Sequence, residues 1–414
     1  MSEILRQAER ARAAWRALSI ADGGVKTRAL EYMVSKMIAR KDELLEANAD
    51  DVRAARENGR AESFIERLTL NDKRVCAMAD GLSALIDIAD PVGEIIEDRH
   101  MPSGLHILKR RVPIGVVAII YESRPNVTAD AAALCLKSGN VSILRGGSDA
   151  LRSNLVITKA LREGIVAAGL PEDCVSLVED VSRETAQKLM TMNELVDLLI
   201  PRGGRSLIES VVRSATVPVI QTGDGICHVY IDGECDMDMA VDIAVSAKVS
   251  RPSVCNSAET LLVDRTVADA FLPVCLDALR EKGVEVRGDE TVLCHRDWVV
   301  KASDADYHTE YNALIYNVKV VSGVEAAIAH INAHGTRHSE AIVTANTEHG
   351  RRFQAGVDAA AVYINASTRF TDGGEFGLGA EVGISNQKLH ARGPMGLKEL
   401  TTYKYEVTGT GQTR

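Results

Sequence analysis

One cysteine of the chain lies where a nucleophile would be useful. Cys255 stands in the segment SRPSVCNSAET, between a helix-like run at residues 236–249 and an apolar, strand-like run at residues 259–263. A thiolate at such a junction is suited to covalent catalysis. A cysteine that only packs as a small buried hydrophobe fits the same segment and is the more frequent case. The neighbours are small and polar, which leaves room for a substrate and offers hydrogen bonds: Ser253, Asn256 and Ser257.

Two loops have the composition of phosphate-binding turns. Arg145-Gly146-Gly147-Ser148 and Arg202-Gly203-Gly204-Arg205-Ser206 each follow a strand-like run and enter a helix-like one. Glycine lets backbone N–H groups approach an anion, a helix N-terminus favours negative charge, and arginine offers a planar fork to phosphate. Neither loop is a G-x-G-x-x-G motif, and each alone fits an ordinary turn. Together they predict a bound phosphorylated nucleotide, held by Arg145, Ser148, Gly203 and Gly204.

Three histidines are spaced four residues apart, at His330, His334 and His338. On one continuous helix they would form a stripe of metal ligands. Gly335 follows His334 at once, so we expect the helix that begins near Gly323 to end there and His338 to leave the stripe. No carboxylate stands at matching spacing inside that helical stretch. The sequence therefore predicts no metal site, and it assigns the histidines to helix capping or to polar contacts around a substrate pocket.

The composition limits the class of protein. The chain has 414 residues, which is too long for one ordinary core and predicts two or three domains. Aromatic residues make up only 4%, so Ala, Val, Leu and Ile dominate the apolar part, as in parallel sheets covered by helices. A net charge of −10 argues against a general nucleic-acid-binding surface.

The cysteines and the apolar runs indicate the compartment. The eight cysteines are scattered without a C-x-x-C pair, which indicates reduced thiols and not a disulfide framework or a zinc ribbon. The N-terminus is charged and amphipathic, and no apolar run approaches the roughly 18 residues of a membrane span. We therefore expect a cytoplasmic protein with no membrane partner.

Helix and strand patterns alternate along most of the chain. Helical periodicity at residues 2–18, 26–57 and 72–89 predicts a helical covering layer. From Ile114 strand and helix patterns follow each other repeatedly, and after Gly225 a second such series begins. This predicts an α/β fold with doubly wound parallel sheets. The expected strands of the first series are residues 114–121, 141–144, 175–178, 195–200 and 217–221, and those of the second include 228–231, 259–263 and 363–365.

Some segments do not fit this alternation. Residues 94–112 have the pattern of two charged strands around a turn at Pro102-Ser103-Gly104, and residues 400–407 alternate in the same way and are expected to pair with them. A hairpin of this kind is poorly stable alone, and an intermolecular arm and an ordinary edge hairpin both remain open. The glycine-rich residues 371–383 fit either a mobile loop at a site entrance or ordinary turns.

Three long motifs resemble those of one family. The run V-x5-H-I-x2-H-G-T-x-H-S-E-x-I, from Val324 to Ile342, is similar to the signature of the γ-glutamyl phosphate reductases. The segment SRPSVCNSAETLLV around Cys255 resembles the active-site segment of that family. The stretch VPIGVVAIIYESRPNVTADAAALCLKSGN from Val112 is similar to it as well. The resemblance extends from about Met1 to Lys404, and the family is a branch of the aldehyde dehydrogenase superfamily.

The resemblance implies three parts. They are a doubly wound, parallel-sheet cofactor domain, an α/β catalytic domain, and a small β oligomerisation arm. Because of the arm, the expected assembly is a homo-oligomer, either a dimer or a tetramer. On this chain the dinucleotide-binding domain would take residues 1–93, 113–225 and 366–388, the catalytic domain residues 226–365, and the arm residues 94–112 and 389–414.

The resemblance also implies a reaction. This is the NADPH-dependent reduction of L-glutamyl 5-phosphate to L-glutamate 5-semialdehyde, with release of phosphate, in proline biosynthesis. The Cys255 thiolate would displace phosphate and carry the acyl group as a thioester for reduction. An oxyanion develops twice and needs N–H donors, for which the backbone N–H of Cys255 and the side chain of Asn126 are the candidates. Functional coupling to a glutamate kinase is a further expectation.

Departures from the wider superfamily refine the implied site. Where hydrolytic members carry a general-base glutamate, this chain has Gln221, which cannot take a proton from water. The superfamily lysine at the adenosine ribose matches Arg145, which can also face a 2′-phosphate. Glu310 resembles the glutamate that holds the nicotinamide ribose. Arg124 and Arg369 are candidates for the substrate phosphate or carboxylate, and surface positions are the alternative for both.

Other functions remain open at this stage. A non-phosphorylating semialdehyde dehydrogenase is the main alternative, and Gln221 speaks against it. A non-catalytic nucleotide-binding module would use Cys255 only for packing. A metallohydrolase built on the histidine run is the most remote of the hypotheses.

Overall fold

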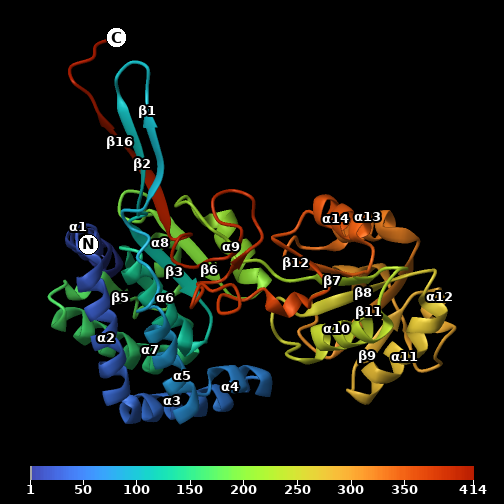
Figure 1. Ribbon diagram of the computed structural model, residues 1–414. Helices are drawn as coiled ribbons and strands as arrows, with labels where there is room; N and C mark the ends of the chain where they lie inside the picture. The colour runs from blue at the N-terminus through green and yellow to red at the C-terminus, as the bar shows by residue number, and fades with distance from the viewer. Residues whose placement is uncertain (1) are drawn as a thin grey trace. The chain divides into compact units, whose positions relative to one another are not determined.

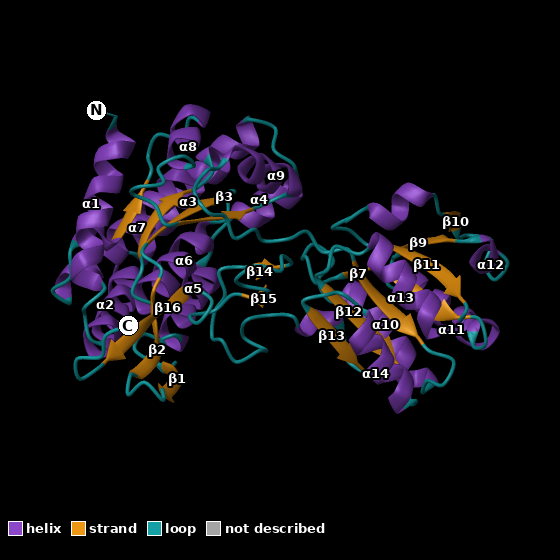
Figure 2. Ribbon diagram, turned by 90° about the horizontal axis from the view of Figure 1, so that it is seen from above, coloured by secondary structure: helices purple, strands orange, loops and turns teal. Residues whose placement is uncertain are grey.

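The protein is described by a computed structural model that covers residues 2–414, apart from the side chain of Ser63. The chain divides into two compact units, and each is built around a parallel sheet (Figure 2). The first unit consists of Met1–Thr222, Gly377–Gly383 and Met395–Arg414, and the second of Gly223–Phe376 and Ile384–Pro394.

Helices make up the N-terminal part of the first unit. The second and the fifth of these helices are capped at their N-termini by side chains. Asp22 accepts a hydrogen bond from the Val25 N–H at 3.0 Å, and Asn71 accepts one from the Arg74 N–H at 2.9 Å. The expected helical layer is therefore present. Its members are α1 (Glu3–Leu18), α2 (Gly23–Ala39), α3 (Lys41–Glu57), α4 (Glu62–Leu68) and α5 (Asp72–Ala84).

The expectation of one helix over residues 26–57 is wrong. The helix breaks at Arg40, where φ is −102° and ψ is 14°. The Arg40 guanidinium pairs with Glu163 and Glu43, which fixes the corner between α2 and α3. Helix propensity cannot reveal such a break, because arginine is a good helix former. The short helix α4 is also absent from the sequence-based expectation, since seven residues are too few for a clear period.

The parallel sheet of the first unit confirms the doubly wound pattern. Its strand order is β5-β4-β3-β6. The chain passes from β3 to β4 and β5 on one side and returns to β6 on the other, so the direction of winding reverses at β3, where such sheets bind ligands beyond their carboxyl ends. The elements are β3 (Val116–Tyr121), α6 (Pro125–Lys137), β4 (Val141–Arg145), η1 (Ser148–Ala150), α7 (Leu151–Ala167), β5 (Val175–Leu177), α8 (Arg183–Leu189), β6 (Leu198–Arg202) and α9 (Arg205–Ser214).

Residues 217–221 do not form the expected strand. Val219 makes one isolated parallel bridge with Leu199, beside which Ile220 donates to the Leu199 carbonyl at 3.0 Å. Pro218 has no N–H to give to a ladder, so the pairing cannot extend into a regular strand. The apolar, β-branched residues of this run therefore predicted a strand that Pro218 prevents.

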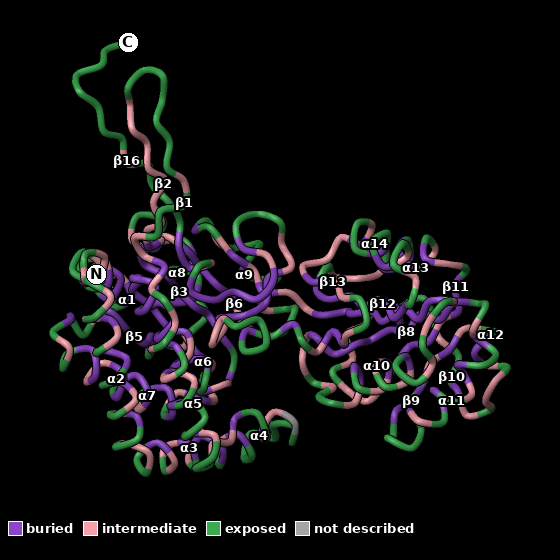
Figure 3. The backbone as a smooth tube through the Cα atoms, viewed as in Figure 1, coloured by how far each residue is buried: buried purple, intermediate pink, exposed green. Residues whose placement is uncertain are grey.

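A small antiparallel sheet belongs to the same unit and has the order β1-β2-β16. It contains β1 (Ile95–His100), β2 (His106–Pro113) and β16 (Thr401–Thr408). The predicted pairing of the C-terminal run with the hairpin is confirmed, since β16 lies antiparallel to β2 along its whole length. The sheet projects from the body of its unit (Figure 1), and much of it is exposed (Figure 3). We call these three strands the arm.

The second unit holds a larger parallel sheet, with the order β10-β9-β11-β8-β7-β12-β13. Helices α10 and α11 cover one face, and α13 and α14 cover the other (Figure 1). The residues of β7 and β8 are therefore buried throughout. The elements are β7 (Cys227–Ile231), α10 (Met237–Val249), β8 (Ala258–Asp264), α11 (Ala268–Glu281), β9 (Glu285–Gly288), α12 (Glu290–Leu293), β10 (Val300–Lys301), β11 (Ile315–Val321), α13 (Gly323–His334), β12 (Ser339–Val343), α14 (Thr347–Gly356) and β13 (Ala361–Ile364).

Three general observations complete the fold. The glycine-rich residues 371–383 contain no helix or strand, and all of them are described. Within residues 2–414 no helix combines the length and the apolar character needed to cross a membrane. In the same range none of the eight cysteines forms a disulfide.

Candidate active site

Cys255 lies on the loop between α10 and β8, before the amino end of a central strand of the second unit. The residues after it fix the loop. Asn256 donates through Nδ2 to the carbonyl oxygens of Thr371 at 2.9 Å and Arg369 at 3.2 Å, and Ser257 donates to the last turn of α10 at 3.3 Å. Asn256 and Ser257 are buried and Cys255 is half-buried. The polar neighbours that the sequence offered as a substrate lining thus serve mainly to hold the loop that presents the thiol.

The backbone of Gly225 packs directly against Cys255. A Cβ atom on Gly225 would lie 1.4 Å from the carbonyl oxygen and 2.9 Å from the Cα atom of Cys255, so this position requires glycine. The thiol of Cys227 donates to the same carbonyl oxygen at 3.2 Å. Burial raises the pKa of the Cys227 thiol well above its ordinary value, which keeps it protonated as a donor. The sequence contained no signal for this contact.

Glu310 holds the same backbone segment. One of its carboxylate oxygens accepts the Gly225 N–H at 3.0 Å. The side chain is half-buried, and burial raises the pKa of the carboxyl group. Glu310 is therefore one hydrogen bond away from the glycine that packs against Cys255, so two residues that the sequence analysis selected lie in one neighbourhood.

Arg369 also contacts the loop that carries the thiol. Its Nε atom donates to the Ser250 hydroxyl at 3.1 Å, and its Nη1 atom donates to the Asn256 side-chain oxygen. Burial lowers the pKa of the Arg369 guanidinium from its ordinary value, and an arginine remains charged in proteins all the same. A fixed cation on the nucleophile loop can hold an anionic substrate group, and it favours a thiolate over a thiol.

A buried ion pair spans the Cys255 loop. Lys248 in the last turn of α10 and Glu259 in β8 are both fully buried, and Nζ lies 2.6 Å from a carboxylate oxygen. Burial raises the pKa of Glu259 to about 7. The two residues lie on either side of Cys255 in the sequence, so their pairing closes the loop at its base. Neither was a candidate from the sequence, because each stands as a single charge in an otherwise apolar run.

Lys248→Met is expected to lower the free energy of unfolding by about 3–5 kcal/mol, because it leaves Glu259 buried without a cation. Urea unfolding at pH 8 measures this loss. The loss should be smaller at pH 5, because a protonated Glu259 is neutral and needs no cation. The sign follows from the raised pKa of this carboxyl group, which makes the folded state less stable as the pH rises and Glu259 loses its proton.

The control for this experiment is Lys188→Met. It breaks an exposed pair with Glu184 of 2.7 Å within one helix, and such a pair contributes about 0.5 kcal/mol or less. Equal losses for the two variants would contradict a structural role for the buried pair.

The first arginine-glycine loop, Arg145–Ser148 in the first unit, has features of an anion-binding site. Arg145 ends β4, is half-buried and donates to the carbonyl oxygen of Val181. Its buried Nε atom has no hydrogen-bond partner among the described residues. A Cβ atom on Gly147 would lie 2.6 Å from the Ser123 hydroxyl, so the backbone runs close to its neighbour there. The exposed Ser148 begins the turn that leads into α7. An unpartnered buried N–H group and an exposed turn fit an anionic ligand.

The second loop already holds an anion. The side chain of Glu122 accepts the Gly204 N–H at 3.0 Å, and a Cβ atom on Gly203 would lie 2.7 Å from its carboxyl carbon. Glu122 follows β3, and Gly203 follows the adjacent β6, so this contact lies where the winding reverses. The sequence analysis did not predict this role of Glu122, although the residue stands only two positions before the candidate Arg124. A phosphate at Gly203 and Gly204 would meet this carboxylate.

Arg124 and Asn126 lie at the N-terminus of α6, in the first unit. Arg124 is the N-cap residue and is half-buried. Asn126 is exposed, and its Nδ2 atom donates to Asp130 at 3.1 Å. Burial raises the pKa of Asp130 to about 6 even though this hydrogen bond acts the other way. The predicted site residues are thus divided between the units, with Arg124, Asn126 and the two loops in one and the thiol segment in the other.

The histidine run breaks where the sequence predicted. Helix α13 ends at His334, and Gly335 is its C-cap. His338 is buried just before β12, with its Nδ1 atom 2.8 Å from the Ser339 hydroxyl and 3.7 Å from the Cys227 sulfur. His330 and His334 stay together on the helix, with ring centroids 4.2 Å apart. The three histidines therefore do not share one stripe.

Many known proteins are similar to this chain in sequence and in fold. Residues 1–293 match the model of the Aldehyde dehydrogenase family. The γ-glutamyl phosphate reductase of Clostridium botulinum (strain Alaska E43 / Type E3) is 53% identical over 414 residues, which cover 100% of both chains. The crystal structure of γ-glutamyl phosphate reductase from Thermotoga maritima has a TM-score of 0.97, with 48% identity and 100% of both chains covered.

A more distant structure shares the fold alone. An acetylating aldehyde dehydrogenase from Geobacillus thermoglucosidasius gives a TM-score of 0.71 at 16% identity, with 100% of this chain and 97% of that one covered. The chain therefore belongs to the aldehyde dehydrogenase family and, within it, to the γ-glutamyl phosphate reductases. The resemblance found in the motifs and the predicted fold class are confirmed.

Proposed function

We propose that this protein reduces L-glutamyl 5-phosphate to L-glutamate 5-semialdehyde and releases phosphate, as a step of proline biosynthesis. The observation that carries the proposal is the presentation of Cys255: a half-buried thiol on a loop fixed by buried neighbours, with the Arg369 guanidinium bound to the same loop. The family relationship supplies the substrate, since the full-length relatives are named γ-glutamyl phosphate reductase.

The thiol of Cys255 carries the acyl group. Its sulfur attacks the carbonyl carbon of the acyl phosphate, the bond from that carbon to the phosphate oxygen breaks, and inorganic phosphate leaves with the bonding electrons. The product of this step is a thioester on Cys255. The reduced form of a bound nicotinamide would supply the hydride and would be oxidised by doing so. Once a hydride had been added at the carbonyl carbon, the oxyanion would collapse, the carbon–sulfur bond would break, and the aldehyde would leave the regenerated Cys255 thiolate.

Negative charge develops on the carbonyl oxygen in both halves of the reaction, so hydrogen-bond donors are needed there. We assign the backbone N–H of Cys255 and the side chain of Asn126 to this task. The packing of Gly225 supports the first assignment, because it fixes the backbone of the nucleophile. Arg124 and Arg369 are assigned to the phosphate and the carboxylate of the substrate, for which a guanidinium is the suited partner.

The cofactor that the family implies is a nicotinamide dinucleotide, and we take it to be NADPH. Arg145, Ser148, Gly203 and Gly204 would hold its phosphates and Glu310 its nicotinamide ribose. The buried, unpartnered Nε atom of Arg145 supports this reading. At the second loop Glu122 accepts the Gly204 N–H, so binding there requires this carboxylate to move aside.

Arg145→Ala is expected to raise the KM for NADPH by about tenfold or more, because a charge-assisted hydrogen bond to a phosphate is lost. The KM for NADH should rise less, since NADH has no 2′-phosphate to meet the guanidinium. Steady-state kinetics with both cofactors measure the ratio. Arg183→Ala, an exposed arginine of the same unit, is the control. An unchanged KM for NADPH in Arg145→Ala would remove Arg145 from the cofactor site, and equal increases for NADPH and NADH would remove it from the 2′-phosphate.

A non-phosphorylating semialdehyde dehydrogenase is the second candidate function. It needs a base that activates water against the thioester, and Gln221 stands where hydrolytic members of the family have a glutamate. Gln221→Glu is therefore expected to divert part of the thioester to hydrolysis. The measurement is NADPH formation from the semialdehyde without phosphate, which should increase at least severalfold over the wild type. Unchanged partitioning would refute a protective role for Gln221.

We further propose that the protein works in the cytoplasm as a homo-oligomer, a dimer or a tetramer, and that its supply of acyl phosphate is coupled to a glutamate kinase. The exposed apolar side chains of the arm support assembly, since Tyr403, Tyr405 and Val407 are 50%, 56% and 54% exposed. The cysteines of the described residues form no disulfides, as expected of a protein in a reducing compartment.

The reverse reaction tests the proposed function. Glutamate 5-semialdehyde and NADP+ are supplied with and without inorganic phosphate, and NADPH formation is followed by absorbance. The proposal predicts sustained turnover only with phosphate, since phosphate is the acceptor of the acyl group. Equal sustained rates without phosphate would overturn it in favour of the non-phosphorylating enzyme.

A further inference from the structure

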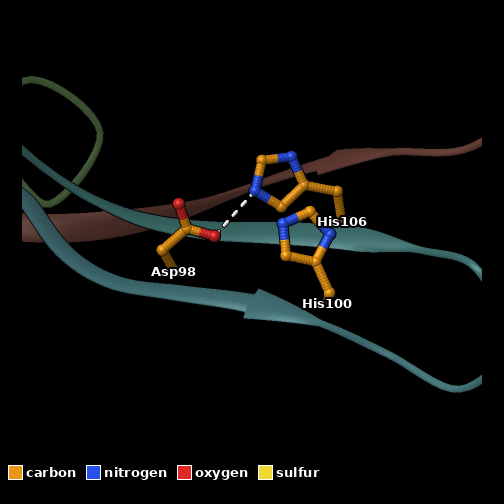
Figure 4. Close-up of side chains that lie close together, drawn as sticks. All are labelled: Asp98, His100 and His106. Atoms are coloured by element: carbon orange, nitrogen blue, oxygen red, sulfur yellow. Dashed lines mark hydrogen bonds and ion pairs between the residues drawn. The ribbon is translucent and has the colours of Figure 1, made fainter.

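Two histidines and an aspartate gather at the tip of the arm, and none of them is among the residues assigned to the reaction. They are Asp98 and His100 on β1 and His106 on β2, and Figure 4 shows the three side chains facing one another. The Nε2 atom of His106 lies 2.7 Å from a carboxylate oxygen of Asp98. The two imidazole rings stack with centroids 4.2 Å apart and an angle of 4° between their planes.

The register of the hairpin creates this group. His100 is paired directly with His106 across the strands, and Asp98 is two residues before His100, on the same face. The turn that fixes the register has Gly104 at φ +85°, where glycine is strongly preferred, and Met101 donates to Leu105 at 2.8 Å to close it. The side chains are therefore brought together by backbone pairing and not by chance contact of mobile loops.

The surrounding charges leave this face suited to a cation. The cations next to the group, Arg99 and Lys109, both pair with Glu97, which points to the opposite face because it alternates with Asp98. Arg110, further along β2, is bound to Glu406 at 2.8 Å. Each of these neighbouring cations thus pairs with an acidic residue other than Asp98, and the partner of Asp98 is the imidazole of His106.

We propose that Asp98, His100 and His106 form a binding site for a divalent transition-metal ion, of which zinc is the best match. Imidazole nitrogen and carboxylate oxygen are ligands that zinc prefers, and three protein ligands leave one position for water. The ligand atoms lie within 4.8 Å of one another. Ligands on one tetrahedral zinc are roughly 3.3 Å apart, given bonds of about 2.0 Å, so side-chain rotations close the difference. The ion would fasten β1, an edge strand, to β2 at its tip.

A second group of similar composition, in the other unit, is less suited to a metal. Asp304, His308 and His334 also bring their ligand atoms within 4.8 Å of one another. The ring of His330 lies 4.2 Å from that of His334, and the ammonium of Lys319 lies 3.5 Å from His330. A fixed positive charge in this neighbourhood opposes a divalent cation. This group supplies the matched control for the arm.

The test is a zinc titration of the full-length chain, prepared without a histidine tag, in competition with a chromophoric chelator. His106→Ala and His100→Ala are each expected to weaken one zinc site by more than about tenfold, because each removes one of three ligands. Cobalt(II) in place of zinc should give the visible absorption of a tetrahedral site, and His106→Ala should abolish it. His308→Ala should leave both the titration and the spectrum as in the wild type.

Three outcomes would overturn the proposal. One is a wild-type chain that takes up no zinc from a micromolar competing chelator. Another is unchanged zinc binding in both His100→Ala and His106→Ala. The third is loss of the site in His308→Ala alone, which would assign the metal to the other group. If His106→Ala fails to fold by circular dichroism, Asp98→Asn with His100→Ala takes its place, since both side chains lie on an exposed edge strand.

Discussion

Replacing Cys255 by alanine is expected to reduce turnover by more than about 10⁴-fold in either direction of the reaction, because no other group can carry the acyl chain. The loop should keep its conformation, since Asn256 and Ser257 hold it through buried hydrogen bonds that the substitution leaves in place. Thermal unfolding of the variant should therefore resemble that of the wild type. The measurement is NADP+ reduction with semialdehyde and phosphate at saturating concentrations.

A second cysteine provides the control for this variant. Cys294 is exposed and follows the short helix α12, and Cys294→Ala should retain full activity. Thiol labelling adds an independent readout: iodoacetamide should inactivate the wild type in step with modification of Cys255, and added substrate should slow both. A Cys255→Ala protein within tenfold of wild-type activity would remove the thioester from the mechanism altogether.

The second large effect is expected at Gly225, whose backbone packs against that of Cys255. In Gly225→Ala the new Cβ atom would lie 1.4 Å from the carbonyl oxygen of Cys255 and 2.4 Å from its carbonyl carbon. Both are backbone atoms, so the nucleophile loop must shift as a whole. A displacement of about 1 Å at the reacting atom costs roughly 10²-fold in rate. We expect kcat to fall by at least that factor, with a smaller change in the KM for NADPH.

Gly81→Ala is the matched control for this substitution. Gly81 lies inside α5, and a Cβ atom there meets only Asp130, at an ordinary 3.7 Å. This variant should keep its activity and gain up to about 1 kcal/mol of stability from its helix. If Gly225→Ala were as active as Gly81→Ala, the backbone packing against Cys255 would have no part in positioning the nucleophile.

The architecture could be predicted from the sequence because it depends on repeating patterns. Alternating strand and helix runs predicted both parallel sheets, and the alternation in residues 400–407 predicted the pairing of β16 with β2. The break at Arg40 and the missing strand at residues 217–221 escaped because each depends on one residue. Arg40 is held in part by Glu163, which is distant in sequence, and Pro218 lacks the N–H that a strand requires.

The site could be predicted only in part. Cys255 was a candidate from its position between a helix and a strand, and family resemblance made it the predicted nucleophile. Glu310 was predicted from that resemblance and Arg369 as a cation for the substrate; all three lie on or beside the same loop. Gly225 and Glu122 were missed because their importance comes from close approach of backbone and carboxylate in three dimensions. No spacing in a single sequence encodes such contacts.

A thioester at Cys255 is the central intermediate of the proposed mechanism, and a single-turnover experiment tests its formation most directly. The enzyme is mixed with glutamate 5-semialdehyde and excess NADP+ in a buffer without phosphate, and NADPH is followed from the first turnover. We predict a burst of about one NADPH per chain, which then stops until phosphate is added, because the acyl group remains on the thiol. Continued NADPH formation without phosphate, or a burst of the same size from Cys255→Ala, would contradict the account.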